Sequence, residues 1–224
     1  MKHAAQIILA LDVDSPLKAR RLTARLLPEI KMFKVGLELF SSAGPQVVRS
    51  IKKKGGKVFL DLKFFDIPNT AAAATRQAVR MGADMLTVHV AGGSAMLKAS
   101  AQAAADEARR LKVKKPLLVG VTVLTSQQAG AQRVLALTRI ALGAGLDGVV
   151  CSAREAGFLR KMIRRPFVIV TPGIRPAGSA GDDQRRTATV SDAVKAGSNF
   201  LVVGRPILKA ADPRAAAKEL KTWI

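Results

Sequence analysis

The chain alternates between short apolar runs and longer segments with helical spacing. Eight runs rich in Val, Ile, Leu and Phe have strand length, and they occupy residues 7–11, 32–35, 58–62, 85–88, 117–123, 148–151, 167–171 and 200–203. Most are apolar throughout, which is typical of parallel strands that are buried on both faces. One intervening segment repeats apolar residues at steps of four and three, namely Leu97, Ala101, Ala104, Ala108 and Leu111. The pattern predicts alternating strands and helices.

Glycines mark the ends of the helical segments at regular distances. They are Gly55, Gly82, Gly145 and Gly197, each a few residues before an apolar run. Glycine suits a helix end because it adopts the left-handed conformation readily. The steps of 63 and 52 residues between the last three are close to twice a unit of about 28. Eight such units predict a single-domain (β/α)8 TIM barrel over residues 1–224, with an open doubly wound sheet as the alternative.

Composition narrows the class of protein. Hydrophobic residues make up 49% of the chain and charged residues 24%, so it can bury a substantial core. A lone cysteine, Cys151, excludes a disulfide framework, and two histidines, His3 and His89, offer little for a metal cluster. No apolar run approaches the roughly 20 residues of a membrane span, and the start of the chain lacks a signal-peptide pattern. We expect a cytoplasmic protein with no membrane partner.

The net charge of +21, from 37 basic and 16 acidic residues, indicates an anionic partner. A nucleic-acid-binding protein is one interpretation. Aromatic residues make up only 4% of the chain and tyrosine is missing, so bases would find few stacking platforms. No helix-turn-helix or RNA-recognition signature is present either. We therefore expect no specific nucleic-acid partner, although weak, salt-sensitive binding is compatible with the charge.

Charged side chains gather where the apolar runs end, which is where barrels hold their chemistry. Asp61 and Lys63 are two apart and so face the same side of a strand, and Asp66 follows three residues later. Neighbouring carboxylates favour the charged form of lysine, so Lys63 is predicted to be a proton donor. Asp61 would repel a substrate carboxylate until that group left as carbon dioxide. A solvated ion pair is the alternative, which Lys34 at another strand end makes less favoured.

A phosphate site is predicted on the loops after the seventh and eighth runs, where barrels often bind phosphate. These loops hold Arg175, Gly204 and Arg205, and Gln184 follows a Gly- and Ser-rich stretch at 178–181. Glycine lets backbone N–H groups approach the phosphate oxygens, and arginine binds them bidentately. The alternative is that both arginines are ordinary surface residues of a basic chain.

The segment 61–70, Asp-Leu-Lys-Phe-Phe-Asp-Ile-Pro-Asn-Thr, resembles the signature of the orotidine 5′-phosphate decarboxylase family. Five further segments resemble that family in the same order, at residues 9–12, 33–36, 121–126, 171–175 and 203–207. Relatives in the ribulose-phosphate-binding superfamily share Asp-x-Lys-x-x-Asp alone. The Ile-Pro-Asn-Thr extension and the other segments make the resemblance specific.

The resemblance implies decarboxylation of orotidine 5′-phosphate to UMP without metal or organic cofactor. It implies that Lys63 protonates C6 of the pyrimidine as carbon dioxide leaves. Asp61 would lie against the scissile carboxylate, with Lys34 completing the charged array. Asp12 and Lys34 would hold the ribose hydroxyls.

The resemblance also implies a homodimer with shared sites. Asp66 and Thr70 would reach into the partner's site, and Thr125 would contact the pyrimidine edge. The implied phosphate ligands are Arg175, Gln184, Gly204 and Arg205.

Three residues and one rival activity complete the interpretation. Phe65 stands where bacterial-type members have histidine, and strand alternation should turn it away from Asp66. His89 is interpreted as a hydrogen-bonded structural residue rather than an acid or base, and Cys151 as a small buried residue.

The rival activity is that of a magnesium-dependent sugar-phosphate lyase or decarboxylase of the same superfamily. Those relatives place an acidic ligand where this chain has Lys34, which opposes a cation.

Overall fold

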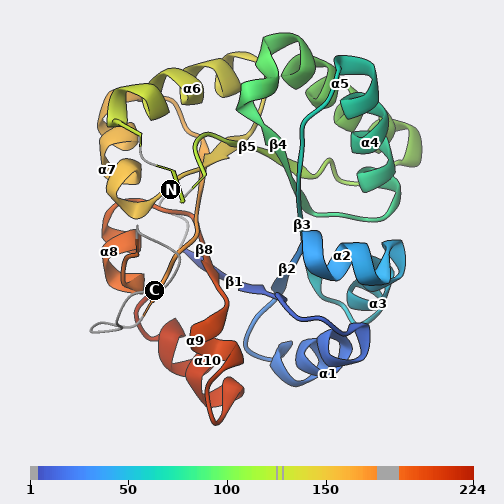
Figure 1. Cartoon of the computed structure of the whole chain (residues 1–224), viewed down its shortest axis with the longest axis vertical. Coiled ribbons are helices and arrows are strands. Elements are labelled where there is room, and N and C mark those ends of the chain that lie inside the picture. The colour runs from blue at the N-terminus through green and yellow to red at the C-terminus, as the bar shows by residue number, and fades with distance from the viewer. Residues whose placement is uncertain (1–4, 125, 128, 176–186) are drawn as a thin grey trace.

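Eight parallel strands pair in chain order, and the last pairs with the first to close a barrel (Figure 1). The computed structural model describes residues 5–124, 126–127, 129–175 and 187–224. The strands are β1 (Gln6–Ala10), β2 (Met32–Gly36), β3 (Lys57–Phe64), β4 (Met85–His89), β5 (Leu117–Val121), β6 (Gly148–Val150), β7 (Val168–Thr171) and β8 (Phe200–Val203). The closed order confirms the predicted (β/α)8 TIM barrel and excludes the open sheet.

Helices surround the barrel and cover the outer face of its sheet (Figure 1). They are α1 (Pro16–Leu26), α2 (Leu37–Ala43), α3 (Pro45–Lys53), α4 (Pro68–Arg80), α5 (Gly93–Leu111), α6 (Ala131–Gly143), α7 (Ala153–Met162), α8 (Val190–Lys195), α9 (Arg205–Leu208) and α10 (Pro213–Lys221), with a 3-10 turn at Val90–Gly92. Among the described residues, no helix is long and apolar enough to cross a bilayer.

Each strand contributes to two hydrophobic cores because successive side chains point to opposite faces. The inner core fills the barrel with Ile8, Ala10, Met32, Phe59, Met85, Val119, Val170 and Val202. The outer core lies between the sheet and the helices, and Leu9, Phe33 and Leu60 are fully or almost fully buried in it. Burial on both faces explains why the strands are apolar throughout.

Three of the predicted helix-ending glycines precede a repeated side-chain-to-backbone hydrogen bond at the amino ends of the strands. Gly82, Gly145 and Gly197 adopt φ values of 85°, 90° and 87°. Two residues later an Asp or Asn side chain accepts the backbone N–H near the start of the preceding odd-numbered strand. The bonds are Val58 to Asp84, Leu118 to Asp147 and Ile169 to Asn199, each 2.8 Å. This hydrogen bond recurs at every second strand. Its recurrence explains why the glycines are separated by about two strand–helix units.

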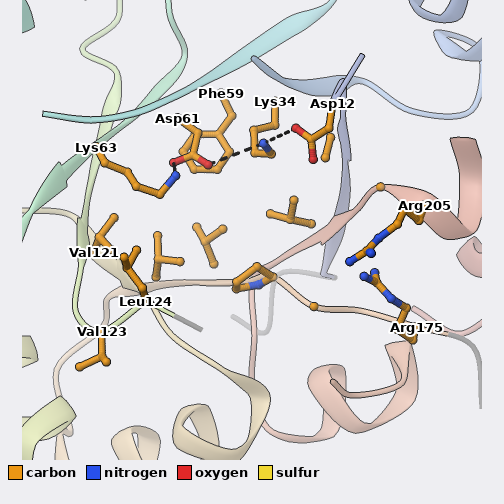
Figure 2. A pocket seen from close by; sticks show the side chains of 17 residues that line it. Asp12, Lys34, Phe59, Asp61, Lys63, Val121, Val123, Leu124, Arg175 and Arg205 are labelled. Carbon is orange, nitrogen blue, oxygen red and sulfur yellow. Dashed lines mark hydrogen bonds and ion pairs between the residues drawn. The ribbon is translucent and has the colours of Figure 1, made fainter. Parts of the chain in front are cut away.

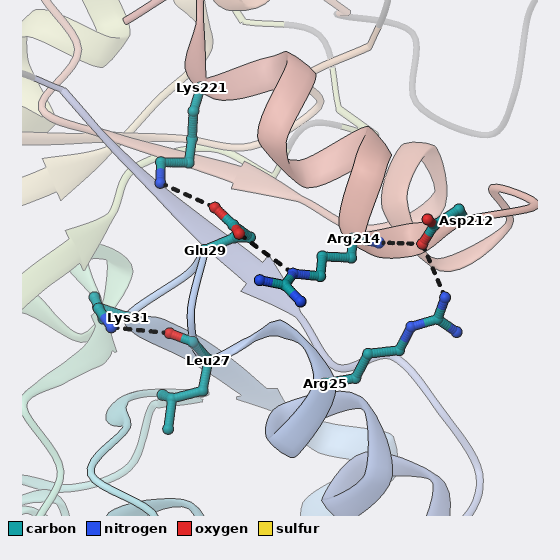
Figure 3. Close-up of polar contacts among 7 residues, drawn as sticks. All are labelled: Arg25, Leu27, Glu29, Lys31, Asp212, Arg214 and Lys221. Carbon is teal, nitrogen blue, oxygen red and sulfur yellow. Dashed lines mark hydrogen bonds and ion pairs between the residues drawn. The ribbon is translucent and has the colours of Figure 1, made fainter.

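The first and last helices, α1 and α10, pack side by side (Figure 3). Arg25 Nη2 lies 2.8 Å from Asp212 Oδ1, and Glu29 accepts from Arg214 at 3.3 Å and from Lys221 at 3.4 Å. Exposed ion pairs of this kind contribute little to stability. The β1–β8 hydrogen bonds and the apolar core therefore contribute most of the free energy that stabilises the closed barrel.

Some predicted strand ends differ from the observed ones by one to two residues. The run predicted at 117–123 pairs as a strand only to Val121, although Val123 still packs against the outer core. An apolar run records burial, and burial continues past the last ladder hydrogen bond. The third strand is longer than predicted, from Lys57 to Phe64, because it continues through the charged residues at the barrel mouth.

Candidate active site

A cavity of about 260 Å³ opens at the carboxyl ends of the strands (Figure 2). Seven of the predicted site residues line it, namely Asp12, Lys34, Asp61, Lys63, Arg175, Gly204 and Arg205. They come from the first, second, third, seventh and eighth strand–loop units, so the barrel joins positions that are far apart in sequence. The structure therefore brings the charged residues of the first three units and the arginines of the predicted phosphate site to one cavity.

One end of the cavity holds alternating charges in a row (Figure 2). Lys34 Nζ lies 2.8 Å from Asp12 Oδ1 and 3.7 Å from Asp61 Oδ2. Asp61 Oδ1 in turn lies 3.0 Å from Lys63 Nζ. Only 11% of the Lys34 side chain and 14% of the Asp61 side chain are exposed, against 55% for Asp12. The centre of the row is withdrawn from water, unlike the solvated ion pair that was the alternative.

A backbone irregularity at the end of β3 places Lys63. Leu60 pairs with Leu86 and Phe64 with Val88, so four steps along β3 oppose two along β4. Lys63 lies within this bulge with a φ of 52°, a left-handed conformation that is uncommon for residues other than glycine. Bulges re-aim side chains beside active sites.

Thr87 on β4 is a site residue that the sequence reasoning missed. Its hydroxyl accepts the backbone N–H of Lys63 at 2.8 Å and donates to Asp61 Oδ1 at 3.1 Å. The side chain faces the barrel interior two residues before His89, and Thr87 is 1% exposed. A polar residue at an inward-facing position of an apolar strand was the signal that could have identified it.

The other end of the cavity is formed by two arginines. The guanidinium groups of Arg175 and Arg205 point into the cavity and toward each other, across from the charged row (Figure 2). Backbone bonds fix the loop that bears Arg175, because its N–H donates to Ala188 and the Ala188 N–H donates to Gly173. Two converging guanidinium groups form a suitable site for a phosphate.

Between the charged ends the cavity wall is apolar. Phe59, Val121, Val123, Leu124, Val150, Val170, Pro172 and Val202 contribute to it. An apolar wall lowers the local dielectric and so strengthens electrostatic interactions at the charged row. The cavity suits a ligand with an apolar middle, a phosphate at one end and a reacting group at the other.

Two predicted residues lie outside this cavity and two are not described. Asp66, two residues before α4, and Thr70, in its first turn, are exposed, and neither lines the cavity of its own chain. Asp66 Oδ1 accepts the N–H of Ile67 at 2.7 Å. Thr125 and Gln184 lie outside the described residues, so their roles stay predictions.

His89 lies at the rim, where it contacts the unusual Phe65. The ring centroids are 5.6 Å apart, and His89 Nδ1 accepts the N–H of Ala91 at 3.3 Å, which agrees with a structural role. Burial and then the positive charge of Lys63 lower the pKa of His89 below its usual 6.5. Phe65 itself is 62% exposed.

Other ligand-type groups are sparse in the part of the chain that the structure describes. No group of three or more His, Cys, Asp or Glu residues there could hold a metal ion. Cys151 is buried as predicted, and burial raises the pKa of its thiol well above the usual range. The position that would hold an acidic ligand in metal-dependent relatives carries Lys34, which is ion-paired on both sides.

Comparisons with known proteins agree with this geometry. Residues 5–220 match the family model described as Orotidine 5′-phosphate decarboxylase / HUMPS. The orotidine 5′-phosphate decarboxylase of Moorella thermoacetica is 50% identical, over 98% of this chain and 92% of that protein. The enzyme of the same name from Syntrophotalea carbinolica is 46% identical over 96% and 93%. A crystal structure of orotidine 5′-phosphate decarboxylase from Lactobacillus acidophilus has a TM-score of 0.86 and 36% identity, with 98% and 99% coverage.

Proposed function

The chain belongs to the orotidine 5′-phosphate decarboxylase / HUMPS family, and we propose that it converts orotidine 5′-phosphate to UMP in pyrimidine biosynthesis. The observation that carries the proposal is the row of alternating charges, with its centre withdrawn from water, facing two arginines across an apolar cavity. The substrate has the matching parts, a phosphate, a flat ring and a carboxylate on that ring. The proposed enzyme acts in the cytoplasm and uses no cofactor.

Lys63 is the proton donor in this proposal. The bond between C6 and the carboxylate carbon breaks, its electron pair stays on C6, and carbon dioxide leaves. Lys63 Nζ then transfers a proton to C6 and regains one from water. Its ammonium is held 3.0 Å from Asp61, so it is already oriented before the carbanion develops. No electrons enter or leave, so the step needs no redox partner.

Asp61 supplies repulsion that the reaction removes. Placed against the scissile carboxylate, it disfavours the bound substrate, and the repulsion ends when the carboxylate becomes neutral carbon dioxide. Lys34 neutralises the other face of Asp61 at 3.7 Å and is itself held by Asp12 at 2.8 Å. Asp12 and Lys34 are proposed to hold the ribose hydroxyls as well.

Phosphate binding offsets the cost of that repulsion. Arg175 and Arg205 take the phosphate at the far end of the cavity, with Gly204 beside Arg205. Gln184 is proposed as a further phosphate ligand and Thr125 as the contact to the pyrimidine edge. Binding energy from a non-reacting group can be used to hold the reacting group in an unfavourable environment.

The direct test is loss of orotidine 5′-phosphate, followed by absorbance with purified protein in EDTA. We expect turnover in EDTA. The Lys63→Ala variant, expressed and purified in the same way, controls for a contaminating host enzyme. Activity that disappears on chelation and returns with magnesium would instead favour the metal-dependent lyase of the same superfamily. No turnover with or without magnesium would refute the decarboxylase.

We further propose a homodimer in which Asp66 and Thr70 complete the partner's site. Both residues are exposed and lie outside the cavity of their own chain. Asp66 is flanked by Phe65 and Ile67, which are 62% and 67% exposed and would gain from burial against a second copy. In a twofold dimer such an exchange is reciprocal.

Mixed dimers test the exchange. Lys63→Ala and Asp66→Ala are each expected to be inactive alone. Unfolded and refolded together in equal amounts, they form about half mixed dimers, in which one site carries both defects and the other neither. Roughly a quarter of wild-type activity should return. Wild type refolded in parallel sets the recoverable maximum, and no recovery despite mixed dimers seen by mass spectrometry would place Asp66 in its own subunit's site.

A further inference from the structure

The hydroxyl of Thr87 joins the two functional parts of β3. It accepts the backbone N–H of Lys63 at 2.8 Å and donates its own hydrogen to Asp61 Oδ1 at 3.1 Å. Thr87 is 1% exposed, so water does not compete for either bond. Asp61 Oδ1 also accepts from Lys63 Nζ, so one carboxylate oxygen is held from two directions.

The bulge explains why a side chain is needed at this place. The β3–β4 pairing slips between Leu60 and Phe64, so the ordinary ladder bond to β4 is interrupted at Lys63. The Lys63 N–H is satisfied by the Thr87 side chain instead. Lys63 also holds a φ of 52°, which an unsupported residue other than glycine would tend to leave.

We propose that Thr87 is a positioning residue, whose hydroxyl holds the Lys63 backbone in the bulge and orients Asp61 toward Lys63. The inference rests on the proposed decarboxylase function, which uses both side chains. Thr87 does not line the cavity and needs no contact with substrate. It acts by fixing the distance and angle between the proton donor and its carboxylate neighbour.

Replacement of Thr87 by valine removes the hydroxyl and keeps the branched shape. Both hydrogen bonds of the hydroxyl are lost. The backbone N–H of Lys63 then has no acceptor and Asp61 Oδ1 loses one donor, in a place that is buried from water. Thr87→Ser keeps the hydroxyl and loses only a methyl group. The matched control is Thr138→Val on α6, because Thr138 is also buried and its hydroxyl bonds only to its own helix, at Val134 O 2.7 Å away.

Steady-state kinetics and UMP binding separate positioning from folding. In Thr87→Val we expect kcat to fall on the order of tenfold to a hundredfold, the cost of a small misplacement of reacting groups. The KM and the affinity for UMP should change less than about threefold, because the phosphate end is untouched. Thr87→Ser should restore kcat to within about threefold of wild type, and Thr138→Val should leave kcat unchanged.

Amide hydrogen exchange at Lys63 gives a readout that does not depend on turnover. Thr87→Val should speed exchange of that amide by about tenfold or more relative to wild type, and Thr138→Val should not. An unchanged kcat in Thr87→Val, a serine variant as impaired as the valine variant, or an unchanged Lys63 exchange rate would each overturn the proposal. If wild type itself fails to turn over substrate, the decarboxylase proposal fails, and the exchange rate still decides whether Thr87 holds Lys63.

Discussion

A substitution at Gly36, at the end of β2, can displace the ammonium group of Lys34 without replacing any charged residue. A Cβ placed on Gly36 would lie 2.9 Å from Lys34 Nζ and 3.5 Å from Asp12 Oδ1. The backbone at Gly36 has φ −94° and ψ −174°, which alanine adopts without strain. Gly36→Ala should therefore act on the position of Lys34 and leave the fold intact.

The size of the effect follows from these distances. Non-bonded heavy atoms prefer roughly 3.5–4.0 Å, so Lys34 Nζ must retreat by about 0.6 Å or more. The Lys34 side chain is only 11% exposed and lies between two carboxylates, so it has little room to move. A shift approaching 1 Å in a catalytic group can cost about a hundredfold in rate. We expect kcat/KM to fall by about tenfold to a hundredfold, while the free energy of unfolding stays within about 1 kcal/mol of wild type.

A double-mutant cycle isolates the cause. In a Lys34→Ala background the displaced ammonium is absent, so Gly36→Ala should cost little further activity. Gly157→Ala in α7 is the matched control, because its new Cβ would lie 4.0 Å from Ala196, an ordinary contact, and its activity should match wild type. Wild-type kcat/KM in Gly36→Ala, or an equal loss with and without the Lys34 amine, would refute this reasoning.

Three further changes test other parts of the site. Lys63→Ala should abolish turnover and leave UMP binding largely intact, measured by calorimetry; turnover within tenfold of wild type would contradict its role as proton donor. Arg205→Ala should cost about 1.5–3 kcal/mol in kcat/KM for the phosphorylated substrate and much less for a substrate without phosphate; equal losses would show that it is not a phosphate ligand. The lowered pKa of His89 means that the folded state resists its protonation, so stability is lost as the pH falls below about 6.5. Chemical denaturation between pH 7 and 5.5 should show a smaller loss in His89→Gln than in wild type, and identical profiles would contradict this effect.

The barrel was predictable because its signals are local. Apolar runs of strand length record burial on both faces, and the glycines at 82, 145 and 197 adopt the positive φ that a helix end favours. Strand ends were less accurate because Val123 stays packed after the ladder stops at Val121. Burial and strand pairing usually coincide, but the sequence pattern reports only the first.

The site was predictable only in part, because some of its geometry depends on pairing between distant residues. The carboxyl-end rule placed Asp61, Lys63 and Arg205 at one cavity, since every strand end points to the same mouth. The bulge on β3 and its Thr87 contact depend on a register slip between two strands. Nothing near Thr87 in sequence encodes its partners, which lie 24 and 26 residues away.

The distribution of charge within the cavity bears on how the proposed reaction uses binding energy. At one end two ammonium groups and two carboxylates alternate, so their charges balance, and an incoming carboxylate meets little net attraction there. At the other end Arg175 and Arg205 present positive charge, where the proposal places the phosphate. In the proposed reaction the attraction is therefore concentrated where no bond changes, and the repulsion from Asp61 acts where a bond breaks. Such an arrangement would raise the rate of the proposed reaction, because the phosphate end would hold substrate and transition state alike and only the loss of the carboxylate would relieve the repulsion.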